Sequence, residues 1–450
     1  MFTNKKASTL FFCIALIFAF LFAFCSCNED TGNNDVSKPT DSEDGGNNDV
    51  SKPTDNEPSI KETEGLNFTL SNDKSYYILS GIGECKDVEI IIPSTYQGLP
   101  VKKIGDYAFG SCKELTSVVI PNSVTEIGSR AFQGCTSLDT IAIPDSIIEI
   151  GDLTFDQCPI KCATIPTNAI SYIPKKNLKT VVINGGASIE HHAFRDSASL
   201  ENVTIENSVE KIEYDAFFNC ISLINVTIGN SVTSIESFAF DQCPIECATI
   251  PTNAIPYIPK ENLKTVVING GTSIGHNAFS GSALLKNVTI GNSVTEIGSR
   301  AFAHCYSLDT IAIPDSVITI SPHSFDSCTS LTNVTIGNKV DKIPDYAFSS
   351  CSSLTSITIP DSVTTIGEYA FTGCFKLESI TIPDGVKTIG AFAFYNCSKL
   401  TIYCEATSEP SGWNSKWNYS NRPVYWYSEG EPSADGNYWH YVNGKIAVWE

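Results

Sequence analysis

The sequence has few charged residues and especially little positive charge. Charged side chains make up 18% of its 450 residues, and 50 Asp and Glu outnumber 29 Lys and Arg, which gives a formal net charge of −21. A surface of this sign repels phosphate backbones and anionic lipid head groups. The composition therefore excludes nucleic acid and anionic membrane surfaces as expected partners.

Sequence motifs of catalysis and metal binding are also missing. There is no His-Glu-x-x-His, Gly-x-Ser-x-Gly, Gly-rich phosphate loop or Cys-x-x-Cys. Of the six His, His191 and His276 occupy the same position in an internal duplication where other copies carry Asp, Ser or Glu, so they are expected on the surface. We expect no catalytic residue, no metal site and no cofactor.

Long apolar runs are absent beyond the first residues. The run from Leu10 to Phe24 follows Lys5 and Lys6 and is shorter than the roughly 20 residues of a membrane-spanning helix. It ends before Ser26-Cys27, which resembles a lipobox, where a small residue precedes a lipid-modified Cys. We therefore predict a lipoprotein signal peptide over 1–27 with lipid at Cys27, and an exported protein at the outer membrane or cell surface that touches membrane only through this lipid. A plain secretory signal or a short anchor is the alternative.

Large apolar side chains are nearly missing from residues 28–60. The segment from Gly32 to Asp41 recurs almost unchanged from Gly46 to Asp55, and both are rich in Asn, Asp, Ser and Pro. Such a segment buries too little apolar surface to offset the entropy of ordering. We predict a disordered polar tether.

What the body does have is a repeat built on phenylalanine. Nine of the eleven intervals between these residues are 23 residues long and two are 39, which makes an 85-residue super-repeat. Residues 156–186 and 241–271 differ at only three of 31 positions, so the super-repeat is a tandem duplication. The predicted core ladder is Phe109, Phe132, Phe155, Phe194, Phe217, Phe240, Phe279, Phe302, Phe325, Phe348, Phe371 and Phe394.

One unit, residues 354–374, shows the expected coil. Leu354, Ile357 and Ile359 alternate as in a short strand with one buried face, and Pro360 then ends the ladder. A single coil cannot bury its apolar side alone, so neighbouring coils must stack on it. The predicted fold class is an α/β-type solenoid that is mostly β and loop, with one short parallel strand per 23-residue coil and about fourteen coils in all. Each 39-residue interval is expected to hold one extra, shorter coil without the Ala-Phe segment.

The motif Leu-x-x-Ile-x-Ile-Pro-x-Ser-Val-x-x-Ile-Gly-x-x-Ala-Phe-x-x-Cys resembles the bacterial BspA-like leucine-rich repeat family. The resemblance covers roughly residues 85–404 and recurs about ten times. It departs from the better-known leucine-rich consensus because Ser replaces the Asn after the strand, as at Ser293 and Ser362. The resemblance implies a leucine-rich repeat solenoid over 104–404, with an N-terminal cap and first repeat over 61–103. It also implies a surface or secreted protein of a host-associated microbe that adheres to matrix proteins or other cells.

Most of the 17 Cys follow the repeat rather than a disulfide pattern. Ten of them, from Cys112 to Cys397, lie three residues after a repeat Phe, where a free thiol acts as a small buried hydrophobe. Disulfides between adjacent coils are the alternative. Cys162 and Cys247 are equivalent in the duplicated unit and are also expected in the core.

The strand alternation predicts which side chains face outward from the sheet. They are small and neutral. They form either a merely solvated face or a flat docking surface for a protein or glycan. In the second case the length of the repeat array would supply avidity. The candidate binding residues are Asn202, Thr204, Asn225, Thr227, Asn287, Thr289, Asn333 and Thr335.

All five Trp lie in residues 405–450, which we predict to be an aromatic β cap. Asn443-Gly444 between Tyr438–Val442 and Lys445–Trp449 is typical of a two-residue hairpin turn. The alternative is a glycan-binding platform that uses Trp413, Trp417 and Trp426. The sequence thus predicts a cell-surface adhesion protein that presents an extended repeat surface to protein partners, and glycan binding by the aromatic cluster is the second hypothesis.

Overall fold

The computed structural model describes residues 62–432 and 436–449. The chain divides into two units, residues 1–59 and 60–450, and every described residue belongs to the second. The predicted signal peptide, Cys27 and the tether over 28–60 lie outside the described residues.

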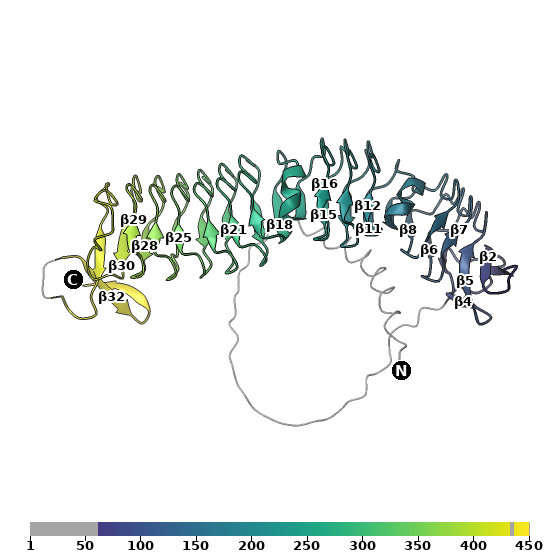
Figure 1. Ribbon diagram of the computed structural model, residues 1–450, viewed down its shortest axis with the longest axis horizontal. Helices are drawn as coiled ribbons and strands as arrows, with labels where there is room; N and C mark the ends of the chain where they lie inside the picture. Colours follow the sequence, from purple (N-terminus) through teal and green to yellow (C-terminus); the bar gives the residue numbers. More distant parts are fainter. Residues whose placement is uncertain (1–61, 433–435, 450) are drawn as a thin grey trace, which may run out of the picture. The chain divides into compact units, whose positions relative to one another are not determined.

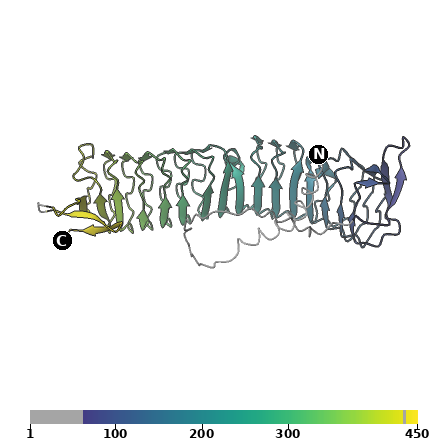
Figure 2. The same cartoon turned by 90° about the horizontal axis from the view of Figure 1, so that it is seen from below.

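The second unit is a stack of coils, and 13 of their strands form one parallel sheet (Figure 1). Equivalent residues pair across coils, as Val203 with Val226 and Thr204 with Thr227. Figure 2 shows these strands side by side along the stack. In chain order the strands are β3 (Glu89–Ile91), β6 (Ser117–Val119), β8 (Thr140–Ala142), β10 (Cys162–Pro166), β11 (Thr180–Gly185), β13 (Asn202–Ile205), β15 (Asn225–Ile228), β17 (Cys247–Pro251), β18 (Thr265–Gly270), β20 (Asn287–Ile290), β22 (Thr310–Ala312), β24 (Asn333–Thr335) and β26 (Ser356–Ile357).

Most coils carry a second, two-residue strand that the sequence did not predict. Ile212 pairs in parallel with Ile189 and with Ile235, one coil away on each side. A strand of two residues is too short to show alternation, so only the stack reveals it. These strands are β12 (Ser188–Ile189), β14 (Lys211–Ile212), β16 (Ser234–Ile235), β19 (Ser273–Ile274), β21 (Glu296–Ile297), β23 (Thr319–Ile320), β25 (Lys342–Ile343), β27 (Thr365–Ile366) and β29 (Thr388–Ile389).

Two sheets that also include further strands close the ends of the unit. The N-terminal one contains two more of the two-residue coil strands, Glu126–Ile127 and Glu149–Ile150, which pair in parallel like those above. The N-terminal sheet contains β1 (Asn67–Leu70), β2 (Tyr77–Gly81), β4 (Thr95–Tyr96), β5 (Leu99–Ile104), β7 (Glu126–Ile127) and β9 (Glu149–Ile150). The C-terminal sheet contains β28 (Ser379–Ile382), β30 (Thr401–Cys404), β31 (Val424–Tyr427), β32 (Tyr438–Val442) and β33 (Lys445–Val448). The predicted hairpin is confirmed: β32 and β33 are antiparallel, and Asn443 and Gly444 have φ of 51° and 72°. The stack has about 16 turns, more than the expected fourteen, because β30 and β31 after the last repeat Phe also join it in parallel.

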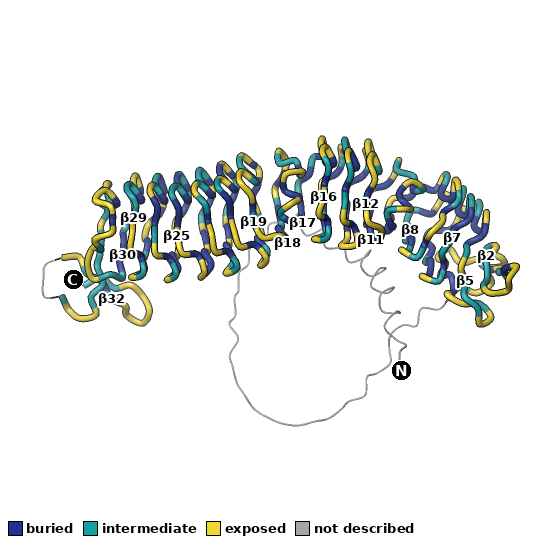
Figure 3. Tube along the Cα trace, in the orientation of Figure 1, coloured by how far each residue is buried: buried dark blue, intermediate teal, exposed yellow. Residues whose placement is uncertain are grey.

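The core is one continuous column along the stack (Figure 3). All twelve repeat phenylalanines are buried. Within each uninterrupted run their rings stack on the next coil with centroids 5.0–5.6 Å apart and planes within 10° of parallel. Each ring therefore covers an apolar face that its own coil could not bury.

Two extra coils interrupt this ring column, as the 39-residue intervals predicted. The short 3₁₀ helices η2 (Thr167–Tyr172) and η3 (Thr252–Tyr257) follow β10 and β17 and take the place of the Ala-Phe segment. Ala254 and Ile255 of η3 and the adjacent Ile258 are buried and fill the gap.

The repeat cysteines satisfy a backbone group as well as filling space. Nine thiols donate to the carbonyl of the repeat Phe one coil earlier, with Sγ···O distances of 3.0–3.2 Å. Ser197 and Ser282 stand at this position after the extra coils, which supply no such Phe, and their buried hydroxyls have no partner. The described cysteines form no disulfide.

Candidate functional site

The outward side of the 13-stranded sheet, called here the sheet face, carries the candidate residues of β13, β15, β20 and β24. Asn202, Thr204, Asn225 and Thr227 are half-buried. The equivalent residues further along, Asn287, Thr289, Asn333 and Thr335, are exposed. The sheet face is therefore most accessible in its second half.

Side chains on the sheet face bond to one another across coils. Asn225 Nδ2 donates to Asn202 Oδ1 at 2.7 Å, and Asn202 Nδ2 donates to Thr180 Oγ1 at 3.2 Å. Ion pairs also join neighbouring coils just before their strands begin. Lys179 Nζ, before β11, lies 2.7 Å from Glu201 Oε1, before β13. These contacts order the side chains in the first half of the face, which reduces the entropy that binding there would cost.

Cys162 and Cys247 lie on the sheet face, and the expectation that both are in the core is wrong. Cys162 pairs with Thr140 and Thr180, which occupy the outward row, because β10 continues the alternation of its neighbours. Both cysteines are half-buried. Burial raises the pKa of the Cys162 thiol, so it stays protonated near neutral pH.

The C-terminal tryptophans mostly close the core. Trp413 and Trp417 are only 6% and 4% exposed, and Trp439 is fully buried. Trp413 Nε1 donates to the Val386 carbonyl at 3.1 Å, and its ring meets Trp417 edge-on at 4.8 Å. Trp426 is half-buried and packs on the core beside Trp413. Neither Trp413 nor Trp417 offers a ring face to solvent, so the structure gives no support to their candidate binding role, and both side chains instead cover the end of the solenoid core.

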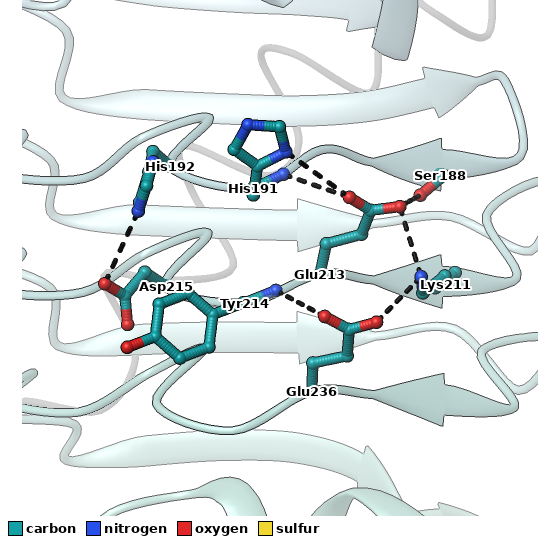
Figure 4. Close-up of polar contacts among 8 residues, drawn as sticks. All are labelled: Ser188, His191, His192, Lys211, Glu213, Tyr214, Asp215 and Glu236. Carbon is teal, nitrogen blue, oxygen red and sulfur yellow. Dashed lines mark hydrogen bonds and ion pairs between the residues drawn. The ribbon is translucent and has the colours of Figure 1, made fainter.

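A polar cluster that the sequence analysis missed spans three coils of the first super-repeat (Figure 4). Lys211 Nζ contacts Glu213 Oε1 at 3.2 Å and Glu236 Oε1 at 2.7 Å. These bonds lower the pKa of both carboxyls and raise that of Lys211. His191 Nδ1 lies 3.7 Å from Glu213 Oε2.

The second half of the cluster centres on a buried carboxylate. Asp215 is 4% exposed, and its Oδ2 contacts Arg195 Nη1 and lies 3.6 Å from His192 Nε2. The equivalent residues of the second super-repeat are Arg300, Ser280 and Asn277. The cluster thus belongs to one copy only. Charged residues one coil apart, such as Glu213 and Glu236, would have revealed it in the sequence.

The chemistry of this cluster is that of ion pairs between coils. Neither it nor any other part of the described chain contains a group of three or more His, Cys, Asp or Glu that could hold a metal ion. Within residues 62–432 and 436–449, no helix is both long and apolar enough to span a bilayer.

Comparison with known proteins agrees with this architecture. Six copies of the BspA type leucine-rich repeat region match residues 102–181, 187–269 and 272–401, well over half of the chain. The chain belongs to the BspA-type leucine-rich repeat family. No curated protein matches it.

Several solved structures of bacterial leucine-rich repeat proteins are similar to it. A leucine-rich repeat protein from Bacteroides ovatus is 24% identical, with 82% of this chain and 94% of that one covered and a TM-score of 0.34. A leucine rich cell surface protein from Faecalibacterium prausnitzii is 29% identical, with 80% and 97% covered and a TM-score of 0.28. The pneumococcal vaccine antigen PcpA is 16% identical, with 82% and 94% covered and a TM-score of 0.27.

Proposed function

We propose that this chain is an exported surface protein that binds protein partners along its sheet face. The observation that carries the proposal is the sheet itself: 13 parallel strands in register present outward rows whose second half is exposed. A long, ordered surface of this kind suits a partner that spans several coils.

The residues of the sheet face favour binding over catalysis. Asn and Thr side chains donate and accept hydrogen bonds, but the face offers no nucleophile paired with a base. It also lacks the Trp and Arg anchors that dominate compact interfaces, so each coil contributes little and affinity grows with the number of coils engaged.

Export to the surface rests on the sequence pattern before the solenoid. The basic residues, the apolar run from Leu10 to Phe24 and Ser26-Cys27 support lipidation at Cys27. The similar protein from F. prausnitzii is described as a cell surface protein. Host extracellular-matrix proteins are the partner class that we propose.

Binding of immobilised matrix proteins, measured by biolayer interferometry over a panel, tests this proposal. Thr289→Arg combined with Thr335→Arg places two bulky cations on the exposed half of the sheet face. We expect affinity to fall roughly tenfold or more, because the flat contact is broken at two coils. The control is Thr319→Arg, at an exposed position of β23 outside the sheet face.

The control should leave affinity unchanged. Equal losses in the control and the sheet-face variant, or binding that survives both, would contradict docking on this face. Far-UV circular dichroism checks that each variant is folded.

A further inference from the structure

A groove beside the second extra coil is not part of the sheet face. It encloses about 570 Å³ and is lined by two segments, residues 241–244 and 256–262. This volume lies within the roughly 300–1,000 Å³ of ordinary ligand sites. The groove lies between the turn that follows Phe240 and the end of η3 with the segment after it.

The lining is largely polar and combines an exposed aromatic residue with negative charge. Tyr257 is 36% exposed and lies between Pro256 and the backbone that leads to Pro259. Asp241 and Glu261 add two exposed carboxylates.

The one cation of this lining, Lys260, is held by backbone carbonyls. Lys260 Nζ donates to the carbonyls of Ile255 at 2.9 Å and Ile258 at 3.1 Å, where it caps the end of η3. Burial lowers the pKa of Lys260. Its amine donates to backbone carbonyls and forms no salt bridge with either carboxylate, although the nearby charge of Glu261 acts against the lowering of its pKa.

These carboxylates lack partners within the described part of the chain. The side chains of Asp241, Gln242 and Glu261 form no hydrogen bond or ion pair there. Two carboxylates and one lysine leave the groove with a net negative charge, and a concave site of this sign concentrates cations.

The first super-repeat provides an internal comparison. There Asp156 accepts hydrogen bonds from Gln133 Nε2 at 2.9 Å and Gln157 Nε2 at 3.4 Å. In the second copy Phe218 replaces Gln133, and it cannot donate.

Two further differences point the same way. Lys176 of the first copy is Glu261 in the second, which reverses the charge. Tyr172 packs against the core in the first copy, whereas the equivalent Tyr257 is exposed. At this one place the second copy therefore differs from the first by a carboxylate without a hydrogen-bond donor, a second carboxylate and an exposed ring.

We propose that this groove binds an arginine side chain of a partner polypeptide. A guanidinium is planar, so it stacks on the Tyr257 ring while its N–H groups donate to the carboxylates of Asp241 and Glu261. The amide of Gln242 is beside them for the arginine backbone. Anionic sugars and phosphates are repelled by the same carboxylates. The inference rests on the proposed function only in taking the partner to be a protein.

The direct test uses the full chain and two small probes. N-acetyl-L-arginine amide carries the guanidinium, and N-acetyl-L-citrulline amide replaces it with a neutral urea of the same shape. Titration by saturation-transfer NMR should show binding of the arginine probe and roughly fivefold weaker or no binding of the citrulline probe. Equal binding of both probes, no arginine binding, or displacement by N-acetylglucosamine would overturn the proposal.

Substitutions of the groove carboxylates test whether the arginine probe binds in this groove. Asp241→Asn with Glu261→Gln removes both charges from exposed positions, and Glu261→Lys installs the residue of the first copy. Both should abolish the arginine signal, whereas Asp156→Asn in the first copy should leave it intact. Binding that is unchanged in the Asp241 and Glu261 variants refutes the site.

The matrix-protein assay separates this proposal from the proposed function. If the arginine probe binds but no matrix protein does, the groove stands and the proposed function fails. If a matrix protein binds through the sheet face while the arginine probe does not bind, the groove proposal alone fails.

Discussion

Replacing Phe348 with alanine tests the stacking argument most directly. The Phe348 ring is fully buried and stacks on Phe325 at 5.3 Å and on Phe371 at 5.6 Å. A buried Phe→Ala change costs about 3–5 kcal/mol, from lost transfer free energy and the cavity that remains. Phe240 is equally buried but stacks on one ring only, Phe217 at 5.0 Å, because η3 follows it. Phe240→Ala should therefore cost less than Phe348→Ala by about 0.5–1.5 kcal/mol, the value of one aromatic pair.

Urea unfolding followed by far-UV circular dichroism measures the two free energies. In a solenoid, stability is approximately a sum over coils and their interfaces, so a weakened coil opens locally first. Hydrogen exchange should consequently rise over the coils on either side of residue 348 and not at residues 109–155. A loss below about 1 kcal/mol for Phe348→Ala, or a larger loss for Phe240→Ala, would refute the reasoning.

Two further predictions concern pH and backbone conformation. Burial raises the pKa of Cys305 to about 12 from its ordinary 9.0, so the folded state keeps a proton that the unfolded chain releases above pH 9. The free energy of unfolding should therefore fall between pH 9 and 12, and Cys305→Ala should flatten this fall; a urea midpoint independent of pH over this range would contradict it. Gly271 and Gly281 have φ of 82° and 76°, but an added Cβ would overlap the Thr252 hydroxyl only at Gly271. Gly281→Ala should cost about 1 kcal/mol and Gly271→Ala at least 2 kcal/mol, and equal melting temperatures for the two would count against this difference.

The repeat length of the sequence was enough to predict most of the fold, because residues one repeat apart become neighbours when the coils stack. The 23-residue spacing of Phe325, Phe348 and Phe371 predicted contacts, and the two 39-residue intervals predicted the extra coils. The two-residue strands, such as β27, could not be found this way because they have no alternation of their own. Their hydrogen bonds depend on the coils on either side.

The candidate site was harder to predict, since residue type does not reveal exposure. Trp413 and Trp417 have the chemistry of a sugar-binding platform, but the exposed core at the end of the stack requires them as cover. Cys162 resembled the other repeat cysteines in type, yet it follows the strand alternation and faces outward. The groove at Asp241 depends on which side chains form hydrogen bonds to neighbouring coils. The sequence does not show these contacts, because they appear only when the coils are stacked.

The extra coils also make the length of this molecule adjustable. β10 pairs with β11 in the same register as β17 pairs with β18. The two ends of an 85-residue segment therefore present matching strands to the coils next to them. Another copy could be inserted, or one removed, at this seam with every remaining coil keeping its neighbours. The length of the solenoid could thus change in steps of 85 residues, while the sheets that close its two ends stay the same.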